Sequence, residues 1–195
     1  LFPTRRSSDL GVRISFYDNK ATEFMLFRQG RLDFINDIDP SFKDEVLSKK
    51  GELRKEWKGK LALSKHSYLN TEYLGILMDT SLPQVRQSPL RLKPVRQAIN
   101  YAIDRRKLVL YLRNSIGTPA ESGFVPAGMP SFDAELVKGY SHDPAKARQL
   151  LREAGFDEQH PARPVKLLTV PAYADLGSFI ARELGEIGLQ TQVEV

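Results

Sequence analysis

Cysteine is absent from this chain of 195 residues. Disulfide bonds, thiolate nucleophiles and cysteine-ligated metals are therefore excluded. The absence does not indicate a compartment, because an exported protein with a large enough core needs no disulfide. A hydrophobic content of 41% and a charged content of 27% are ordinary for a globular protein of one or two domains.

Long hydrophobic runs are also lacking. No stretch reaches the ~18 apolar residues of a membrane span, and no charged-then-apolar leader precedes a cleavage site. In a complete protein the missing leader would indicate the cytoplasm. We expect instead a piece of a longer protein, incomplete at both ends, because the chain begins without methionine and stops in a strand-like alternation at residues 189–195.

Residue constellations for catalysis or metal binding are missing as well. The three histidines have no ligand partner at helical spacing, and the sequence contains neither a G-x-S-x-G elbow nor a P-loop. Asp33, Asp37 and Asp39 alternate, but Pro40 breaks the calcium-loop pattern. We therefore expect a protein that is not an enzyme and that holds no metal or cofactor.

The formal net charge is +5, and basic residues gather between residues 86 and 113. A cluster of this kind indicates either a nucleic-acid surface or solvated helix faces. No regular interleaving of aromatic and basic residues, as in many nucleic-acid surfaces, accompanies the charges. We favour solvated helix faces and expect no nucleic-acid partner. The cluster comprises Arg86, Arg91, Lys93, Arg96, Arg105, Arg106, Lys107 and Arg113.

The clearest structural signal lies in residues 88–113. Pro94 suits a first helical turn, and apolar residues then recur at spacings of three and four. Asp104 is placed to cap a second helix over residues 105–113. The pattern predicts two consecutive amphipathic helices. Their predicted buried residues are Val95, Ala98, Ile99, Ala102, Ile103, Leu108, Val109 and Leu112.

The N-terminal part predicts a strand–helix–strand unit. Residues 12–17 alternate like a strand, and residues 32–35 suit a buried one. Between them, residues 20–29 predict a helix with Phe24, Met25 and Phe27 inward.

Three further segments follow this unit. Residues 40–50 predict a short helix, and residues 61–78 form the longest strand-like region. Residues 80–93, which contain two prolines, predict a loop.

The C-terminal part predicts a second unit of alternating strands and helices. Asp143 and Pro144 begin a helix that Gly155 ends. Strands at residues 165–170 and 189–195 flank a helix at residues 176–187, and should be parallel with a right-handed crossover. The two units define the α/β class, and residues 114–139, rich in glycine and proline, predict a long loop between them.

Three segments carry a more specific signal. PVRQAINYAIDRRKLV, at residues 94–109, resembles the helical segment that opens the large C-terminal lobe of family 5 extracytoplasmic solute-binding proteins, the peptide- and nickel-binding receptors of ABC importers. TEYLGILM, at residues 71–78, is similar to the hinge strand of that family, and YSHDPAKARQLLREAGF, at residues 140–156, to a later helix. The segments occur in the family's order, and the resemblance extends over residues 11–195.

The resemblance implies a two-lobed periplasmic-binding-protein-like fold of the class II (cluster C) type. Residues 11–72 would form part of the first lobe, residues 73–78 the hinge strand, and residues 79–195 the N-terminal part of the large second lobe. Residues 1–10, LFPTRRSSDL, resemble a translated sequencing adapter and are interpreted as a non-native leader. A natural disordered arm is the alternative.

The resemblance also implies the substrate-binding component of an ABC importer, a monomer that binds an oligopeptide between its lobes and docks on permease subunits. It would be periplasmic or lipid-anchored. Nickel, haem and oligosaccharides stay open as ligands. The alternative is the ligand-sensing domain of a cytoplasmic transcriptional regulator.

The same resemblance implies ligand-binding residues. Tyr73 matches the hinge-strand tyrosine, although a half-buried structural tyrosine is an equal alternative. Gly75 would allow close approach of a ligand backbone that pairs with this strand. Asn36 and Asp37 follow a predicted strand end in the first lobe, where further ligand contacts are expected.

Overall fold

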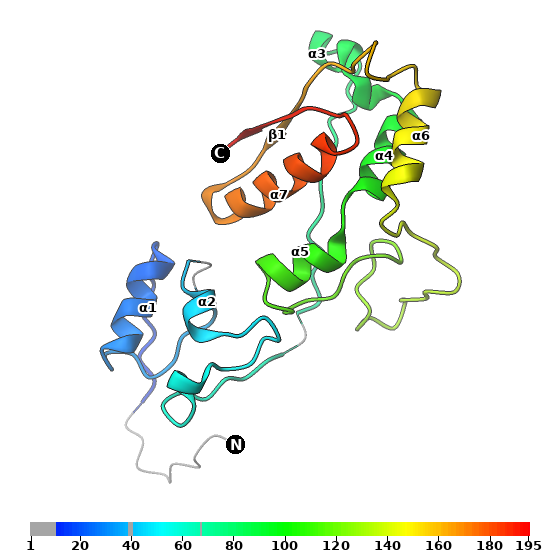
Figure 1. The fold of residues 1–195 in the computed structure, drawn as a ribbon. Coiled ribbons are helices and arrows are strands. Elements are labelled where there is room, and N and C mark those ends of the chain that lie inside the picture. Colours follow the sequence, from blue (N-terminus) through cyan, green and yellow to red (C-terminus); the bar gives the residue numbers. More distant parts are fainter. Residues whose placement is uncertain (1–10, 39–40, 67) are drawn as a thin grey trace. The chain divides into compact units, whose positions relative to one another are not determined.

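The computed structural model describes residues 11–38, 41–66 and 68–195 (Figure 1). The chain separates into two compact units, one ending at Glu45 and the other spanning Val46–Val195. Each unit is described by itself. The leader predicted at residues 1–10 lies outside the described residues, as do Asp39 and Pro40.

The first unit is built around helix α1, Lys20–Arg28. Asn19 caps the helix by accepting a hydrogen bond from the Thr22 amide at 3.0 Å. Phe24 is 1% exposed and packs against Phe42 with ring centroids 4.9 Å apart. The prediction that Met25 points inward is wrong, because its side chain is 42% exposed.

The two strands predicted in the first unit are also wrong. Residues 12–17 and 32–35 contain no strand, so this unit holds no strand–helix–strand motif. Val12 and Phe16 are more than nine-tenths exposed. A strand persists only where a neighbour pairs with its backbone, and among the described residues of this unit none does.

The described residues from 41 to 78 are mostly irregular. Of the predicted helix 40–50, the described residues 41–50 form helix α2, Lys43–Val46, and a 3₁₀ turn η1 follows at Lys55–Trp57. Residues 61–66 and 68–78 contain no strand, and the only ladder contact among them is an isolated bridge from Leu61 to Lys58. The long strand predicted here is therefore wrong as a paired strand.

The predicted loop at residues 80–93 contains two short helices. These are α3, Pro83–Gln87, and the 3₁₀ helix η2, Pro89–Arg91. Each begins with a proline, which fits the first helical turn because that turn needs no amide donor. The prediction misread the prolines as loop residues where they start helices.

The double helix is confirmed. Helix α4 spans Lys93–Ala102 and helix α5 spans Arg105–Leu112. Asp104 accepts a hydrogen bond from the Lys107 amide at 2.9 Å and caps α5. All five apolar residues predicted on α4 and its end are buried, whereas those on α5 are half-buried.

The C-terminal unit of strands and helices is confirmed as well. Helix α6, Pro144–Glu153, is capped by Asp143, which accepts from the Lys146 amide at 2.8 Å. Strand β1, Val165–Leu168, pairs in parallel with β2, Thr191–Glu194, in the register Val165 to Thr191. Turn η3, Pro171–Tyr173, and helix α7, Ala174–Gly185, connect them. The right-handed crossover stays a prediction.

One apolar core joins these elements. Helices α4 and α6 lie side by side, and α7 packs on β2 and touches α4 and α5 (Figure 1). Ala98 and Ala102 of α4 and Ala147 of α6 are buried in this core, and Leu189 is 0% exposed. The core consists of Val95, Ala98, Ile99, Ala102, Ile103, Ala147, Leu150, Leu151, Ala162, Val165, Phe179, Ile180, Leu184, Ile187 and Leu189.

Candidate functional site

The predicted site residues Tyr73 and Gly75 both lie within residues 71–78, which we call the extended segment. Tyr73 is 70% exposed, and its ring meets Phe124 edge to face with centroids 4.9 Å apart. The Thr71 hydroxyl donates a hydrogen bond of 2.8 Å to the Phe124 carbonyl oxygen. Phe124 belongs to the long loop 114–139, so this loop fixes one end of the extended segment.

A second anchor comes from turn η3, which connects strand β1 to helix α7. The Tyr173 hydroxyl donates to Glu72 at 3.1 Å, and the Arg113 guanidinium stacks over the Tyr173 ring at 5.6 Å. The first three residues of the extended segment are therefore held from two places, while the residues after Tyr73 run free of such ties in the described part of the chain.

The backbone of the extended segment is unpaired. Within the described ranges, the amide and carbonyl groups of residues 72–78 form no hydrogen bond to another backbone group. A Cβ atom added at Gly75 would meet nothing within 4 Å. An extended backbone with open space beside it offers the same donors and acceptors as the edge of a sheet.

Several apolar side chains of the extended segment, of the residues just before it and of the long loop are exposed. They are Tyr68, Leu69, Tyr73, Leu74, Leu77, Met78, Phe124, Val125, Met129, Leu136 and Val137.

The other two predicted residues, Asn36 and Asp37, share one exposed turn of the first unit. Asp37 has a left-handed backbone with φ of 102°, and its carboxylate accepts a hydrogen bond from the Ile38 amide at 2.8 Å. Aspartate tolerates this conformation better than most residues. The geometry explains Asp37 as a turn residue, and ligand contact by Asn36 and Asp37 stays a prediction.

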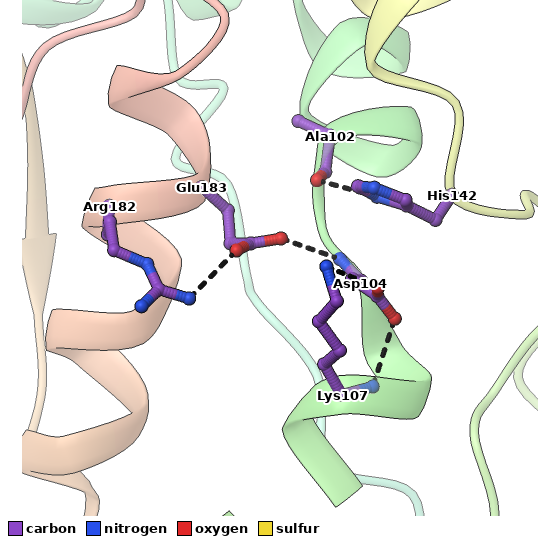
Figure 2. A network of polar contacts seen from close by, with 6 residues as sticks. All are labelled: Ala102, Asp104, Lys107, His142, Arg182 and Glu183. Carbon is purple, nitrogen blue, oxygen red and sulfur yellow. Dashed lines mark hydrogen bonds and ion pairs between the residues drawn. The ribbon is translucent and has the colours of Figure 1, made fainter. Parts of the chain in front are cut away.

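Figure 2 shows a polar network at the junction of α4 and α5. Glu183 on α7 is 3% exposed, accepts from the Asp104 amide at 3.3 Å and pairs with Arg182 at 3.1 Å. His142 Nδ1 lies 3.0 Å from the Ala102 carbonyl oxygen. The network satisfies backbone groups where one helix ends and the next begins, so it fixes three elements against one another.

An open hollow of about 380 Å³ lies beside this junction. Arg106 and Glu121, both in its lining, are joined by two hydrogen bonds of 3.1 and 2.8 Å that Arg106 donates. The pKa of Glu121 lies below its ordinary value, chiefly because Arg106 donates to the carboxylate. The hollow is lined by Asp104, Arg106, Lys107, Leu110, Glu121, Ser141 and His142.

Asp104 is the second carboxylate of the hollow. Burial acts to raise its pKa, but the hydrogen bond from the Lys107 amide and the neighbouring charges of His142 and Lys107 outweigh burial. The pKa of Asp104 therefore lies below its ordinary value, and the residue acts as an ionised helix cap.

Several arginines of the basic cluster are tied to the protein's own backbone. Arg86 donates to the Thr80 and Ser81 carbonyl oxygens, Arg96 to those of Leu90 and Arg91, and Arg105 to that of Asn100. Burial lowers the pKa of Arg105. Arg96 and Arg105 thus bond carbonyl oxygens in the last turns of η2 and α4, and Arg86 bonds the chain just before α3.

Sequence reasoning missed Phe124, the Arg106–Glu121 pair and Glu183. Phe124 and Glu121 lie in an aperiodic loop, where no spacing rule predicts contacts. Glu183 did carry a signal, because it lies three residues after Ile180 and four before Ile187, on the apolar face of α7. A charged residue at such a position needs a partner.

Two negative findings apply to the described part of the chain. It contains no group of three or more histidine, cysteine, aspartate or glutamate side chains arranged to hold a metal ion. None of its helices has both the length and the apolar character to cross a membrane.

Residues 11–195 match the family described as bacterial extracellular solute-binding proteins, family 5 Middle. The chain belongs to this family. The resemblance stated from the three sequence segments is thereby confirmed.

Two curated relatives illustrate the match. The chain is 33% identical over 109 residues to the glutathione-binding protein GsiB of Shigella flexneri, covering 56% of this chain and 21% of GsiB. It is 26% identical over 182 residues to heme-binding protein A of Haemophilus influenzae, covering 91% of this chain and 30% of that protein. The chain thus spans less than a third of these relatives.

Solved structures show the same fold. NikA from Brucella suis, crystallised with Fe(III)-EDTA, matches with a TM-score of 0.70 at 18% identity over 91% of this chain and 35% of NikA. DppA from Helicobacter pylori, in complex with the peptide STSA, matches with a TM-score of 0.68 at 20% identity over 91% of this chain and 31% of DppA. The predicted α/β, two-lobed binding-protein fold is confirmed, and this chain supplies part of it.

Proposed function

We propose that the protein is the substrate-binding component of an ABC importer and that its ligand is an oligopeptide. Family membership supports solute binding. The observation that carries the peptide assignment is the unpaired backbone of residues 72–78, flanked by the exposed ring of Tyr73. A peptide in extended conformation can pair with such a backbone whatever its side chains are.

The wider proposal follows the family. The protein acts outside the cytoplasm, either in the periplasm or on a lipid anchor, as a monomer that docks on permease subunits after closing on its ligand. Residues 73–78 serve as the hinge strand, and Tyr73, Gly75, Asn36 and Asp37 contact the ligand.

The ligand assignment is tested on the intact protein by isothermal titration calorimetry. Tri- to pentapeptides, glutathione, haem and a nickel–histidine complex are compared under one condition. We expect binding of peptides with little dependence on sequence. Tight binding of haem or nickel with no peptide binding would overturn the peptide assignment.

Backbone pairing is tested by methylating peptide amides one at a time. A methyl group removes a donor and blocks one edge of an extended peptide, so alternate positions should lose affinity while the positions between them do not. Equal losses at all positions, or none, would contradict pairing with the extended segment.

The Tyr73→Ala variant should weaken the binding of every peptide to a similar degree, because the ring contributes contact area without recognising a particular side chain.

A further inference from the structure

The long loop closes on itself next to the extended segment. A Cβ atom at Gly139 would lie 2.7 Å from the Glu121 carbonyl carbon and 3.1 Å from the Ser122 amide nitrogen. One at Gly123 would lie 2.6 Å from the Val137 side chain. Residues 121–123 and 137–139 therefore form a tight neck, and we call residues 121–139 the closed loop.

The closed loop contacts the extended segment on one side. A Cβ atom at Gly128 would lie 2.8 Å from the Leu69 side chain, so the backbone of the closed loop passes close to the chain just before the extended segment. Phe124 of the closed loop makes two further contacts with the extended segment. Its carbonyl oxygen accepts a hydrogen bond from the Thr71 hydroxyl, and its ring packs against that of Tyr73.

On another side the neck is held by helix α5. Arg106 lies in the first turn of α5 and grips the Glu121 carboxylate with both a side-chain Nε and an Nη. A bidentate pair fixes direction as well as distance, which a single lysine contact does not. Glu121 is three residues before Phe124, so the pair sets where the closed loop leaves the helix.

We propose that Arg106 and Glu121 are positioning residues for ligand binding: they orient the closed loop so that Phe124 holds the Tyr73 ring in place. Neither residue contacts the ligand. The inference rests on the proposed binding role of Tyr73, and it adds a determinant of affinity that lies on a helix away from the extended segment.

The test uses the intact protein labelled with fluorotyrosine and read by ¹⁹F NMR without ligand. The Tyr73→Phe variant assigns the Tyr73 resonance by its loss. Phe124→Leu should then shift that resonance, because it removes the ring at 4.9 Å. Arg106→Gln and Glu121→Gln should shift it in the same direction. The double exchange of Arg106→Glu with Glu121→Arg restores opposite charges and should return it toward its original position.

A matched control exists in the same loop. Lys138 and Glu135 form an ion pair of 3.1 Å that does not reach α5. Lys138→Gln should leave the Tyr73 resonance and peptide affinity unchanged. Arg106→Gln should weaken peptide binding about two- to fivefold, the range of a partly exposed ion pair acting indirectly.

The outcomes separate the two proposals. If Phe124→Leu moves the Tyr73 resonance but Arg106→Gln and Glu121→Gln do not, the positioning role is overturned. If all three move it while the original protein binds no peptide, positioning stands and the peptide function fails. Circular dichroism checks that each variant is folded, and recovery in the charge exchange excludes a general loss of structure.

Discussion

The α4–α6–α7 core and the extended segment use their backbones in opposite ways. Each core helix satisfies most of its amides within itself and buries one apolar face in the shared core. The extended segment has apolar side chains and strand-like alternation but no backbone partner among the described residues. Helices are thus complete within a local stretch, whereas a strand is complete only when something pairs with it.

The largest effect on stability should come from a substitution in the α4–α6–α7 core. Leu189→Ala removes a side chain with 0% exposure and leaves a cavity, which should cost about 2–5 kcal/mol of unfolding free energy. Leu77→Ala, at a side chain 59% exposed, should cost about 0.5 kcal/mol or less. Urea denaturation of both variants measures the difference. Equal costs would show that the extended segment is packed as tightly as the core.

A second test concerns the junction that the core supports. Glu183→Ala leaves the buried Asp104 amide without its acceptor and should destabilise the protein by about 1–3 kcal/mol. Glu186→Ala, an exposed site one helical turn further along, should change the stability by about 0.5 kcal/mol or less. Thermal unfolding with circular dichroism detection compares the two. A silent Glu183→Ala would mean that water replaces the carboxylate and that the network does not hold the junction.

A smaller effect should depend on pH. Because the folded-state pKa of Asp104 is lowered from 3.8, its ionised form stabilises the folded protein above that pH, and the contribution fades as the pH falls through the folded-state pKa. Asp104→Asn keeps a capping oxygen but does not titrate, so it should cost about 1 kcal/mol or less at neutral pH. The gap between the two proteins should shrink below pH 3.8, measured by urea denaturation at several pH values. A gap that stays constant with pH would contradict the ionised cap.

The smallest effect on stability should occur in the extended segment. Gly75→Ala adds a methyl group into space with nothing within 4 Å, so the unfolding free energy should change by less than about 0.5 kcal/mol. Peptide affinity should nevertheless fall, because the methyl group stands where a ligand backbone would approach. Calorimetry and urea denaturation on the same sample separate the two quantities. Unchanged affinity would remove Gly75 from the site.

The same contrast explains which parts of the fold the sequence predicted. Asp104, Asp143 and the apolar stripe of α4 act within a few residues, so local spacing is enough to indicate their roles. The pairing of residues 165–168 with 191–194 was predictable because a helix brings the two strands together. The strand at residues 12–17 was predicted from alternation and the one at residues 61–78 from its strand-like composition and from resemblance to a hinge strand, and none of these supplies a partner.

The candidate site was predicted only in part, for a related reason. Tyr73 and Gly75 were named from their resemblance to a hinge strand, and no contact had to be known. Phe124, Arg106 and Glu121 depend on how a glycine- and proline-rich loop folds back. Its tight neck can form because Gly139 and Gly123 lack a Cβ atom. The spacing of residues in the sequence does not predict which segments such glycines will allow to come together.

The unpaired backbone of the extended segment also allows hydrogen exchange to detect a bound ligand. Its amides should exchange with deuterium almost as fast as those of an unfolded chain, because no carbonyl group of the described residues bonds to them. Successive amides of an extended chain point to opposite edges, so a ligand on one edge would slow exchange at Tyr73, Gly75 and Leu77 or at Leu74, Ile76 and Met78, but not at both sets. The set that slows would identify the occupied edge and, with it, the direction from which the ligand enters.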